Sequence, residues 1–140
     1  MIDTFRGQYR FLSNFFPALC NYEGLVYPTV EHAYQAAKSL DQSVRKVIAD
    51  ALTAQEAKAL GRAAALRADW DEVKLTVMED LLRLKFSNRE VGNLLIMTGN
   101  EELVEGNWWG DVFWGVCKGK GENHLGRLLM KIREELKHNA

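Results

Sequence analysis

The sequence predicts an α+β fold in which helices predominate, with short strands near the N-terminus and an irregular strand-loop region before the last helix. Apolar residues recur at helical spacing in several segments after residue 40. Before residue 28, aromatic residues alternate with turn residues, a pattern typical of short strands and loops. A chain of 140 residues with 47% hydrophobic composition can bury a core without disulfides or metal ions. We therefore expect residues 1–140 to form a single compact domain.

Composition excludes several classes of function. The formal net charge is −1, so charge indicates neither general nucleic-acid binding nor attraction to an anionic membrane. Cys20 and Cys117 lie far apart in the sequence, and no segment resembles a signal peptide or a membrane span. No two histidines lie at metal-ligand spacing. We expect a cytoplasmic protein with free thiols, no metal and no cofactor.

The first quarter of the chain should form short strands and loops that lead into a helix. Residues 20–22 and 25–27 flank Glu23 and Gly24, which predicts a small antiparallel hairpin. Pro28 should end the extended run, and Thr29 should cap a helix that starts directly after it. Along that helix, one face carries three polar residues at positions i, i+4 and i+7, namely Glu31, Gln35 and Lys38. Glu31 is equally well explained as an ordinary capping acid, favoured by the helix dipole.

Five further helices are expected. Apolar spacing predicts one over 44–51, and the capping box of residues 53–56 opens the next, which Gly61 and Arg62 should interrupt. That glycine would permit close packing or bring Arg62 near a site, although a solvated arginine is the simpler interpretation. A long helix should begin at Trp70, with an apolar face formed by Trp70, Val73, Val77, Leu81 and Leu84, and with Met78 and Leu82 beside them.

Asn88 is predicted to cap a shorter helix that Gly99 ends, and residues 102–105 read as a short strand. The last helix should start at about residue 123.

Residues 106–121 have the least regular composition, with three tryptophans, five glycines and the single acid Asp111. This composition indicates an ordered loop with aromatic surfaces. A glycine-rich segment before a helix offers backbone N–H groups to an anion, so Lys120 and the start of the last helix form a candidate phosphate site. A simple connecting loop explains the same residues equally well.

Taken together, the motifs resemble the NADAR (YbiA-like) family over nearly the whole chain. The residues that carry this resemblance, in the order of the family, are 11–15, 27–38, 61–62, Trp70, 111–115 and 121–126. The resemblance implies an N-glycosidase that cleaves the bond between ribose C1′ and nitrogen. Its substrates would be phosphorylated ribosylamino-pyrimidine intermediates of riboflavin biosynthesis, or ADP-ribose attached to guanine or nucleic acid. Cys117 departs from the glycine that many relatives have at this position, which affects the expected loop shape.

The residues present suit that chemistry. Cleavage of an N-ribosyl bond passes through an oxocarbenium-like centre, so the site needs a carboxylate that stabilises this charge or activates water. Glu31 and Asp111 are the candidates implied by the family, and we favour Glu31 as the base. The other expected substrate contacts fall into three groups: Trp70 and Trp114 for the heterocycle; Ser13, Asn14, Gln35 and Asn123 for polar groups; Lys38, Arg62 and Lys120 for phosphate.

Two other classes of function remain open. A non-catalytic module that binds ADP-ribose or a nucleotide would use the same aromatic and basic residues but would need no pair of carboxylates. A structural protein would use Trp108, Trp109 and Trp114 as core or contact residues and would bind no ligand. The sequence does not choose among the N-ribosyl substrates, and it does not fix the oligomeric state.

Overall fold

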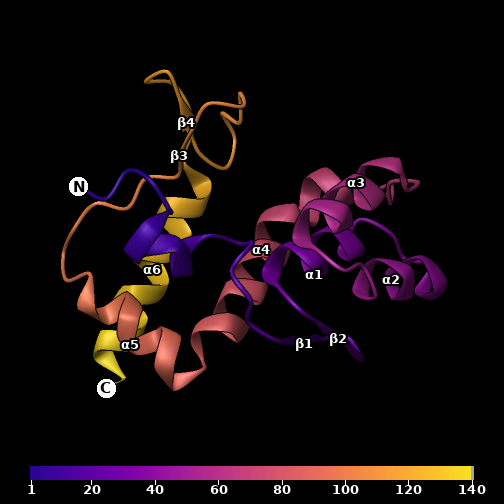
Figure 1. Ribbon diagram of the computed structural model, residues 1–140, viewed down its shortest axis with the longest axis horizontal. Coiled ribbons are helices and arrows are strands. Elements are labelled where there is room, and N and C mark those ends of the chain that lie inside the picture. Colours follow the sequence, from indigo (N-terminus) through magenta and orange to yellow (C-terminus); the bar gives the residue numbers. More distant parts are fainter. Residues whose placement is uncertain (140) are drawn as a thin grey trace. The chain divides into compact units, whose positions relative to one another are not determined.

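The computed structural model describes residues 1–139 and divides into two compact units, each described by itself below (Figure 1). Unit 1 contains Met1–Ser13 and the chain from Phe86 onward, and unit 2 is Asn14–Lys85. The predicted class is confirmed, since helices predominate and the strands are few and short. The single domain over residues 1–140 stays a prediction. Among the described residues, no helix is both long and apolar enough to cross a membrane.

Unit 2 contains a hairpin and four helices: β1 (Cys20–Tyr22), β2 (Leu25–Tyr27), α1 (Val30–Ala37), α2 (Gln42–Ala49), α3 (Ala54–Ala63) and α4 (Trp70–Phe86), of which the last residue belongs to unit 1. The predicted hairpin is confirmed, with β1 and β2 antiparallel and Cys20 opposite Tyr27. Glu23 and Gly24 both have positive φ, at 49° and 91°. Two central residues with positive φ are typical of a type I′ turn, whose twist suits a two-residue hairpin.

Helix α1 is the centre of unit 2. As predicted, Thr29 caps it, because its hydroxyl accepts a hydrogen bond from the His32 backbone N–H at 3.0 Å. The carbonyl of Asn14 accepts from the Glu31 N–H at 3.0 Å, which satisfies a second donor at the helix start. Every residue of α1 is buried, since α2 and α3 both pack against it. The polar side chains of this helix are therefore held inside the unit.

Helix α3 corrects one prediction. Its capping box is confirmed at the N-cap, where the Thr53 hydroxyl accepts from the Glu56 N–H at 3.0 Å. Gly61 does not interrupt the helix, which continues to Ala63. Instead, a Cβ atom added at Gly61 would lie only 2.1 Å from Oε1 of Gln35 on α1. The close approach of α3 to α1 therefore requires a glycine here. Close packing was one of the two roles that the sequence suggested for Gly61.

Helix α4 begins at Trp70 as predicted, but its buried face is rotated from the predicted one. Leu84, predicted to be apolar core, is 39% exposed, whereas Lys85 is only 1% exposed. The buried positions are Trp70, Val77, Met78, Leu81, Leu82, Lys85 and Phe86. This spacing is still helical, and it places a lysine where a hydrophobic residue is usual.

Unit 1 contains the 3₁₀ helix η1 (Gly7–Leu12), α5 (Arg89–Met97), β3 (Gly106–Asn107), β4 (Val116–Cys117) and α6 (His124–His138). Helices α5 and α6 pack side by side (Figure 1). Asn88 caps α5 through hydrogen bonds from the N–H groups of Glu90 and Val91, as predicted. Residues 7–12 are helical rather than the predicted strand and loop, because Gly7 at φ 57° turns the chain into η1.

The predicted strand over 102–105 is reduced to one parallel bridge between Leu103 and Ile2, while β3 forms further along. The parallel pair of β3 and β4 matches Gly106 with Val116 and Asn107 with Cys117. These short pairings anchor the N-terminus of the chain and the loop region to the same part of unit 1.

Candidate functional site

Glu31 lies in the first turn of α1 and is 8% exposed. Burial raises the pKa of its carboxyl group, while a hydrogen bond from Gln35 and the charges of Lys58 and Lys38 oppose this rise. The side-chain amide of Gln35, one turn along α1, donates from Nε2 to Oε2 of Glu31 at 2.5 Å. Oε1 of Glu31 accepts no hydrogen bond from the described residues. One carboxylate oxygen is thus held in place and the other remains available to a ligand.

Two buried side-chain oxygens near this carboxylate lack partners among the described residues. They are Oε1 of Gln35 and Oδ1 of Asn14. Nδ2 of Asn14 contacts Sδ of Met78 at 3.6 Å, and the Asn14 backbone carbonyl accepts from the Glu31 N–H. Buried acceptors are usually satisfied, so each such oxygen calls for an explanation. Both belong to residues that the sequence analysis assigned to substrate binding.

Positive charge gathers beside Glu31. Lys38 ends α1, is half-buried, and lies 5.6 Å from the centre of the Tyr34 ring. Burial lowers the pKa of Lys38, Glu31 raises it, and the nearby cations Arg62, Lys58 and Lys74 lower it further. Arg62 itself is exposed on α3. Several cations that interact around one carboxylate form a local field suited to an anion.

Lys58, on α3 and half-buried, was absent from the sequence-based list of site residues. Of the neighbouring charges, Lys58 has the greatest effect on the pKa of Glu31, which it lowers. Lys58 precedes Gly61 by three positions, so the two residues lie on the same face of α3. Helical spacing alone could therefore have placed Lys58 near Gln35, which Gly61 approaches.

Trp70 and Tyr34 form an aromatic pair in unit 2. The ring of Trp70 lies 5.1 Å from that of Tyr34, tilted by 58°. Trp70 is 5% exposed, so it is mainly a core residue at the start of α4. Only its exposed edge is open to a ligand. This geometry fits the wall of a pocket better than an open stacking platform.

His32, next to Glu31, is used for structure. Its Nδ1 lies 2.8 Å from the Thr29 hydroxyl, and its Nε2 lies 3.0 Å from the Ala51 carbonyl oxygen. Because a carbonyl only accepts, Nε2 carries the hydrogen of that bond. The ring therefore ties the start of α1 to the end of α2.

Asp111 belongs to unit 1. Its Oδ1 accepts hydrogen bonds from the backbone N–H groups of Phe113 and Trp114, at 3.1 and 2.9 Å. The side chain of Asn107 bonds to both the N–H and the carbonyl of Asp111. Such an Asx turn has a clear structural role. The carboxylate retains Oδ2, to which none of the described residues donates a hydrogen bond, and a catalytic role for Asp111 stays a prediction.

Trp114 and Asn123 are also fixed by local contacts in unit 1. The half-buried Trp114 ring packs edge-on against Phe113 with centroids 4.8 Å apart. Oδ1 of Asn123 accepts from the Glu105 N–H, and Nδ2 donates to the Leu103 carbonyl, both at 3.0 Å. Asn123 thus holds residues 103–105 against the start of α6. Ser13 caps the C-terminal end of η1.

The proposed phosphate site at Lys120 loses part of its rationale. Lys118–Gly119 form a tight turn in which Cys117 and Lys120 exchange backbone hydrogen bonds, at 2.8 and 3.1 Å. The turn precedes α6 by several residues. The N–H groups of residues 122–125 already donate to carbonyls of residues 112–115. The donors that a phosphate would have used at the start of α6 are therefore occupied, and only the exposed Lys120 amine remains.

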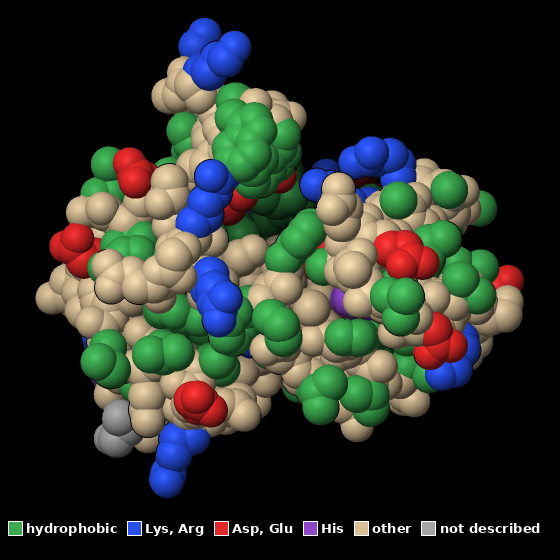
Figure 2. Space-filling model, in the orientation of Figure 1, with side chains coloured by type: hydrophobic (Ala, Val, Ile, Leu, Met, Phe, Trp, Pro, Cys, Tyr) green, Lys and Arg blue, Asp and Glu red, His purple; other side chains and the backbone are tan. Residues whose placement is uncertain are grey.

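Among residues 1–139, no group of three histidine, cysteine or acidic side chains is placed to hold a metal ion. On the face shown in Figure 2, basic and acidic side chains are interspersed rather than gathered into one continuous basic field. The charged features that bear on ligand binding are local ones.

Unit 2 thus holds a buried carboxylate with cations around it, a combination of groups that is common in small-ligand sites. A model of the NADAR domain matches residues 4–137, so this chain belongs to the NADAR family. It is 42% identical over 137 residues to an N-glycosidase of Nostoc punctiforme, covering 93% of this chain and 87% of the relative. It is also 38% identical over 134 residues to a riboflavin biosynthesis protein of Vibrio vulnificus, covering 93% of this chain but 36% of that protein.

A solved structure gives the same result for the fold. The NMR structure of the Escherichia coli protein YbiA aligns with a TM-score of 0.85 at 38% identity, and it covers 99% of this chain and 88% of YbiA. YbiA of that species is named an N-glycosidase. The family identified from the sequence motifs is thereby confirmed.

Proposed function

We propose that this chain is an N-glycosidase that hydrolyses the C1′–N ribosyl bond of a glycosylated small molecule. The substrates to be tested are phosphorylated ribosylamino-pyrimidine intermediates of riboflavin biosynthesis and ADP-ribosylated guanine. The names of its relatives support the reaction class. The observation that carries the proposal is the buried Glu31 carboxylate, oriented by Gln35. We place the reaction in the cytoplasm.

Burial suits Glu31 to act as the base. A carboxylate whose pKa is raised by burial takes a proton from water more readily than an ordinary carboxylate does. Its negative charge also stabilises the positive charge that develops at C1′ when the bond to nitrogen breaks. The Gln35 hydrogen bond fixes Oε2, which leaves Oε1 to contact the attacking water. The proton then moves from water to Glu31, the hydroxyl oxygen bonds to C1′ as the C1′–N bond breaks, and the departing nitrogen takes up a proton from solvent.

The remaining roles follow from the same unit. We assign the unpartnered oxygens of Gln35 and Asn14 to hydrogen bonds with ribose hydroxyl groups or with the base, which requires both side chains to turn out of the fully buried positions that they occupy here. Lys38 and Arg62 bind the substrate phosphate, joined by Lys58 and Lys74. The edge of Trp70 contacts the heterocycle. The other residues implied by the family resemblance, Asp111, Trp114, Ser13, Lys120 and Asn123, belong to unit 1, and their roles in the reaction stay predictions.

The test is incubation of the purified protein with both substrate classes, followed by detection of the freed sugar. Glu31→Gln should abolish turnover, because it keeps the shape of the side chain and removes its charge. Glu72→Gln, an exposed acid in the first turn of α4, is the matched control and should remain active. A Glu31→Gln variant that keeps more than about a tenth of kcat, a loss below roughly 1.4 kcal/mol, would show that Glu31 is not the catalytic carboxylate.

Binding without turnover would favour the other class of function, a module that binds ADP-ribose or a nucleotide. In that case the wild-type protein would retain ligand but release no sugar from any member of the panel. Glu31→Gln would then bind at least as tightly as wild type, since an anionic ligand would meet less negative charge.

A further inference from the structure

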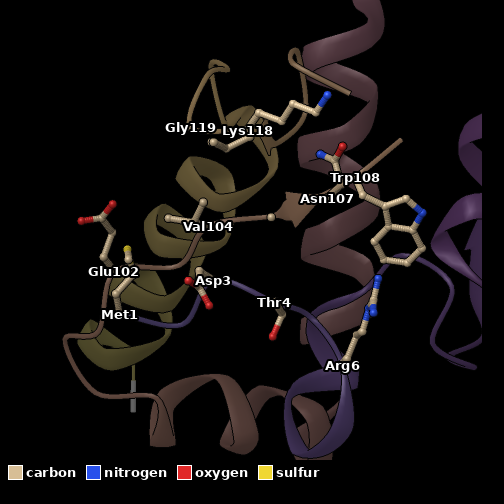
Figure 3. A pocket seen from close by; sticks show the side chains of 12 residues that line it. Met1, Asp3, Thr4, Arg6, Glu102, Val104, Asn107, Trp108, Lys118 and Gly119 are labelled. Atoms are coloured by element: carbon tan, nitrogen blue, oxygen red, sulfur yellow. The ribbon is translucent and has the colours of Figure 1, made fainter. Parts of the chain in front are cut away.

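A second pocket lies entirely within unit 1 and includes none of the residues assigned to the reaction. It has a volume of about 620 Å³, within the range of roughly 300–1,000 Å³ that is usual for small-molecule sites. Residues from three separate stretches of the chain line it: the N-terminal segment, residues 102–108 and residues 116–119 (Figure 3).

Backbone pairing places these stretches together. The N–H of Ile2 donates to the Glu102 carbonyl and the N–H of Val104 donates to the Ile2 carbonyl, both at 2.8 Å. The N–H of Gly106 then donates to the Asp3 carbonyl at 3.1 Å. The N-terminal segment therefore runs parallel to residues 102–106. Continuing in this direction, it brings Arg6 to Trp108.

The third stretch is placed by the pairing of β3 with β4. Since Asn107 lies opposite Cys117, the turn that follows directly at Lys118 and Gly119 is brought to the pocket, which both residues line. Lys118 and Gly119 have positive φ, at 52° and 76°, as in a type I′ turn. A non-glycine residue in this conformation is uncommon, and the turn holds the lysine outward.

Arg6 and Trp108 form the recognition surface of the pocket. The guanidinium carbon of Arg6 lies 3.9 Å from the centre of the Trp108 ring, so one face of the indole is covered by a cation. Trp108 also meets the Trp109 ring in a T-shaped contact with centroids 4.8 Å apart, but it is 68% exposed, so much of its ring surface remains accessible to a base. Within residues 1–139, the Arg6 guanidinium has neither a hydrogen bond nor an ion pair. Its N–H groups are thus free to bind an anion while the ring is free to stack.

The other charges in the pocket are unevenly placed. Glu102 and Met1 lie at the end opposite Trp108, with Asp3 and Thr4 between the two ends (Figure 3). The N-terminal amine is paired with Glu101 at 2.7 Å, outside the pocket. The cations Arg6 and Lys118 therefore dominate the tryptophan end. The carboxylate of Asp3 and the hydroxyl of Thr4 are suited to hydrogen bonds with sugar hydroxyl groups.

We propose that this pocket is a second binding site, for a nucleoside phosphate unit whose base stacks on Trp108 and whose phosphate is held by Arg6 and Lys118. Stacking on an aromatic ring combined with cationic contacts to phosphate is a general way to bind nucleotides. The site does not depend on the N-glycosidase proposal, because no residue of that reaction lines it. Its ligand is either a free nucleotide or one unit of a single strand.

The test uses the indole N–H signals of the chain's four tryptophans in a ¹H–¹⁵N NMR spectrum. The Trp108→Phe variant loses one signal and so assigns it. Adenosine monophosphate added to the wild type should shift the Trp108 signal in a saturable way. Adenosine and ribose 5-phosphate, each lacking one half of the ligand, should bind at least about tenfold more weakly, because stacking and phosphate contacts each contribute at least that factor.

Arg6→Gln should weaken the binding monitored at Trp108 about tenfold, while Arg127→Gln, an exposed arginine on α6 outside the pocket, should not change it. A short single-stranded oligonucleotide that binds much more tightly than the mononucleotide would identify a strand as the source. Equal affinities would identify the free nucleotide.

Three results would overturn the proposal. The first is a Trp108 signal that stays fixed while those of Trp70 or Trp114 move, since binding would then be elsewhere. The second is equal binding of adenosine and its monophosphate. The third is an equal loss of affinity in Arg6→Gln and Arg127→Gln, which would indicate only a general effect of net charge.

Discussion

The substitution Gly61→Ala should damage activity more than stability. The new Cβ would lie 2.1 Å from Oε1, 2.7 Å from Cβ and 2.9 Å from Cδ of Gln35. No pair of non-bonded heavy atoms can approach so closely. Oε1 and Cδ can move with the flexible side chain, whereas the Cβ of Gln35 moves only if α1 shifts relative to α3.

Two opposing terms set the size of the effect on stability. Alanine is favoured over glycine within a helix by about 1 kcal/mol. Overpacking of a close contact costs roughly 1–3 kcal/mol. We therefore expect a net loss of about 1 kcal/mol in the free energy of unfolding. Displacement of the Gln35 amide also breaks its hydrogen bond to Glu31, and a bond to a charged group contributes roughly 1.5–3 kcal/mol. The corresponding fall in kcat is about tenfold to a hundredfold.

A double-mutant cycle with Gln35→Ala tests this reasoning. Urea denaturation gives the stabilities and single-turnover kinetics gives the rate of the chemical step. Because Gln35→Ala removes two of the three close contacts, Gly61→Ala should be less destabilising in that background and should reduce kcat little further. Gly61→Ala that stabilises the protein by about 1 kcal/mol, with no coupling to Gln35, would refute the close approach of α3 to α1.

Three further predictions concern charge. Burial lowers the pKa of Lys85 to about 7, whereas the same lysine in the unfolded chain keeps its proton above that pH. The free energy of unfolding should therefore rise from about pH 7 to 8.5, by at most roughly 1.4 kcal/mol per pH unit. Lys85→Met should flatten this rise, measured by thermal unfolding. Asp111→Asn should keep the turn, since its Oδ1 still accepts, but reduce kcat at least about tenfold. Lys38→Ala should raise KM for a phosphorylated substrate more than for its dephosphorylated form, whereas Lys120→Ala should raise it less.

Contrary results have distinct meanings. The upper limit of pH 8.5 matters because burial raises the pKa of Cys20 to about 11, so above that limit the Cys20 thiol ionises first in the unfolded chain and offsets the rise due to Lys85. An equally steep pH dependence in Lys85→Met would assign the rise to other groups. Full activity of Asp111→Asn would leave Asp111 with the turn alone. Equal effects of Lys38→Ala on both forms of the substrate would remove Lys38 from the phosphate site.

The parts of the fold that depend on neighbouring residues were predictable from the sequence. The caps at Thr29, Thr53 and Asn88 and the turn at Glu23–Gly24 all form as predicted, because each depends on a few adjacent residues. The 3₁₀ helix was missed because aromatic residues beside glycine suit strands and tight helical turns alike.

Tertiary contacts explain the remaining errors. Gly61 was expected to interrupt α3, since only the neighbouring α1 reveals why a glycine is needed inside a helix. For α4, the pattern predicted Leu84 in the core, but the spacing of Val77, Leu81 and Lys85 defines the buried face. A lysine in that series could have been noticed, yet charged residues are so seldom fully buried that hydrophobicity alone selects the leucine.

The same distinction applies to the candidate site. Helical spacing placed Glu31, Gln35 and Lys38 together, and the structure agrees for the bonded pair. Lys58 was missed because it comes from another helix. For Asp111 and Asn123, the family motif marked the positions, but only the structure shows how many of their polar atoms are already used in local hydrogen bonds.

Glu31 shows how one position meets two opposing requirements. At the first turn of α1 the helix dipole stabilises the carboxylate, typically by 0.3–1 kcal/mol, and the Gln35 hydrogen bond adds to this. Burial acts in the other direction and has the larger effect, since the pKa is raised overall. A carboxylate in this balance stays inside the protein without a tight ion pair to neutralise it. That makes its charge available to a cationic transition state, which is why its removal should affect catalysis more than folding.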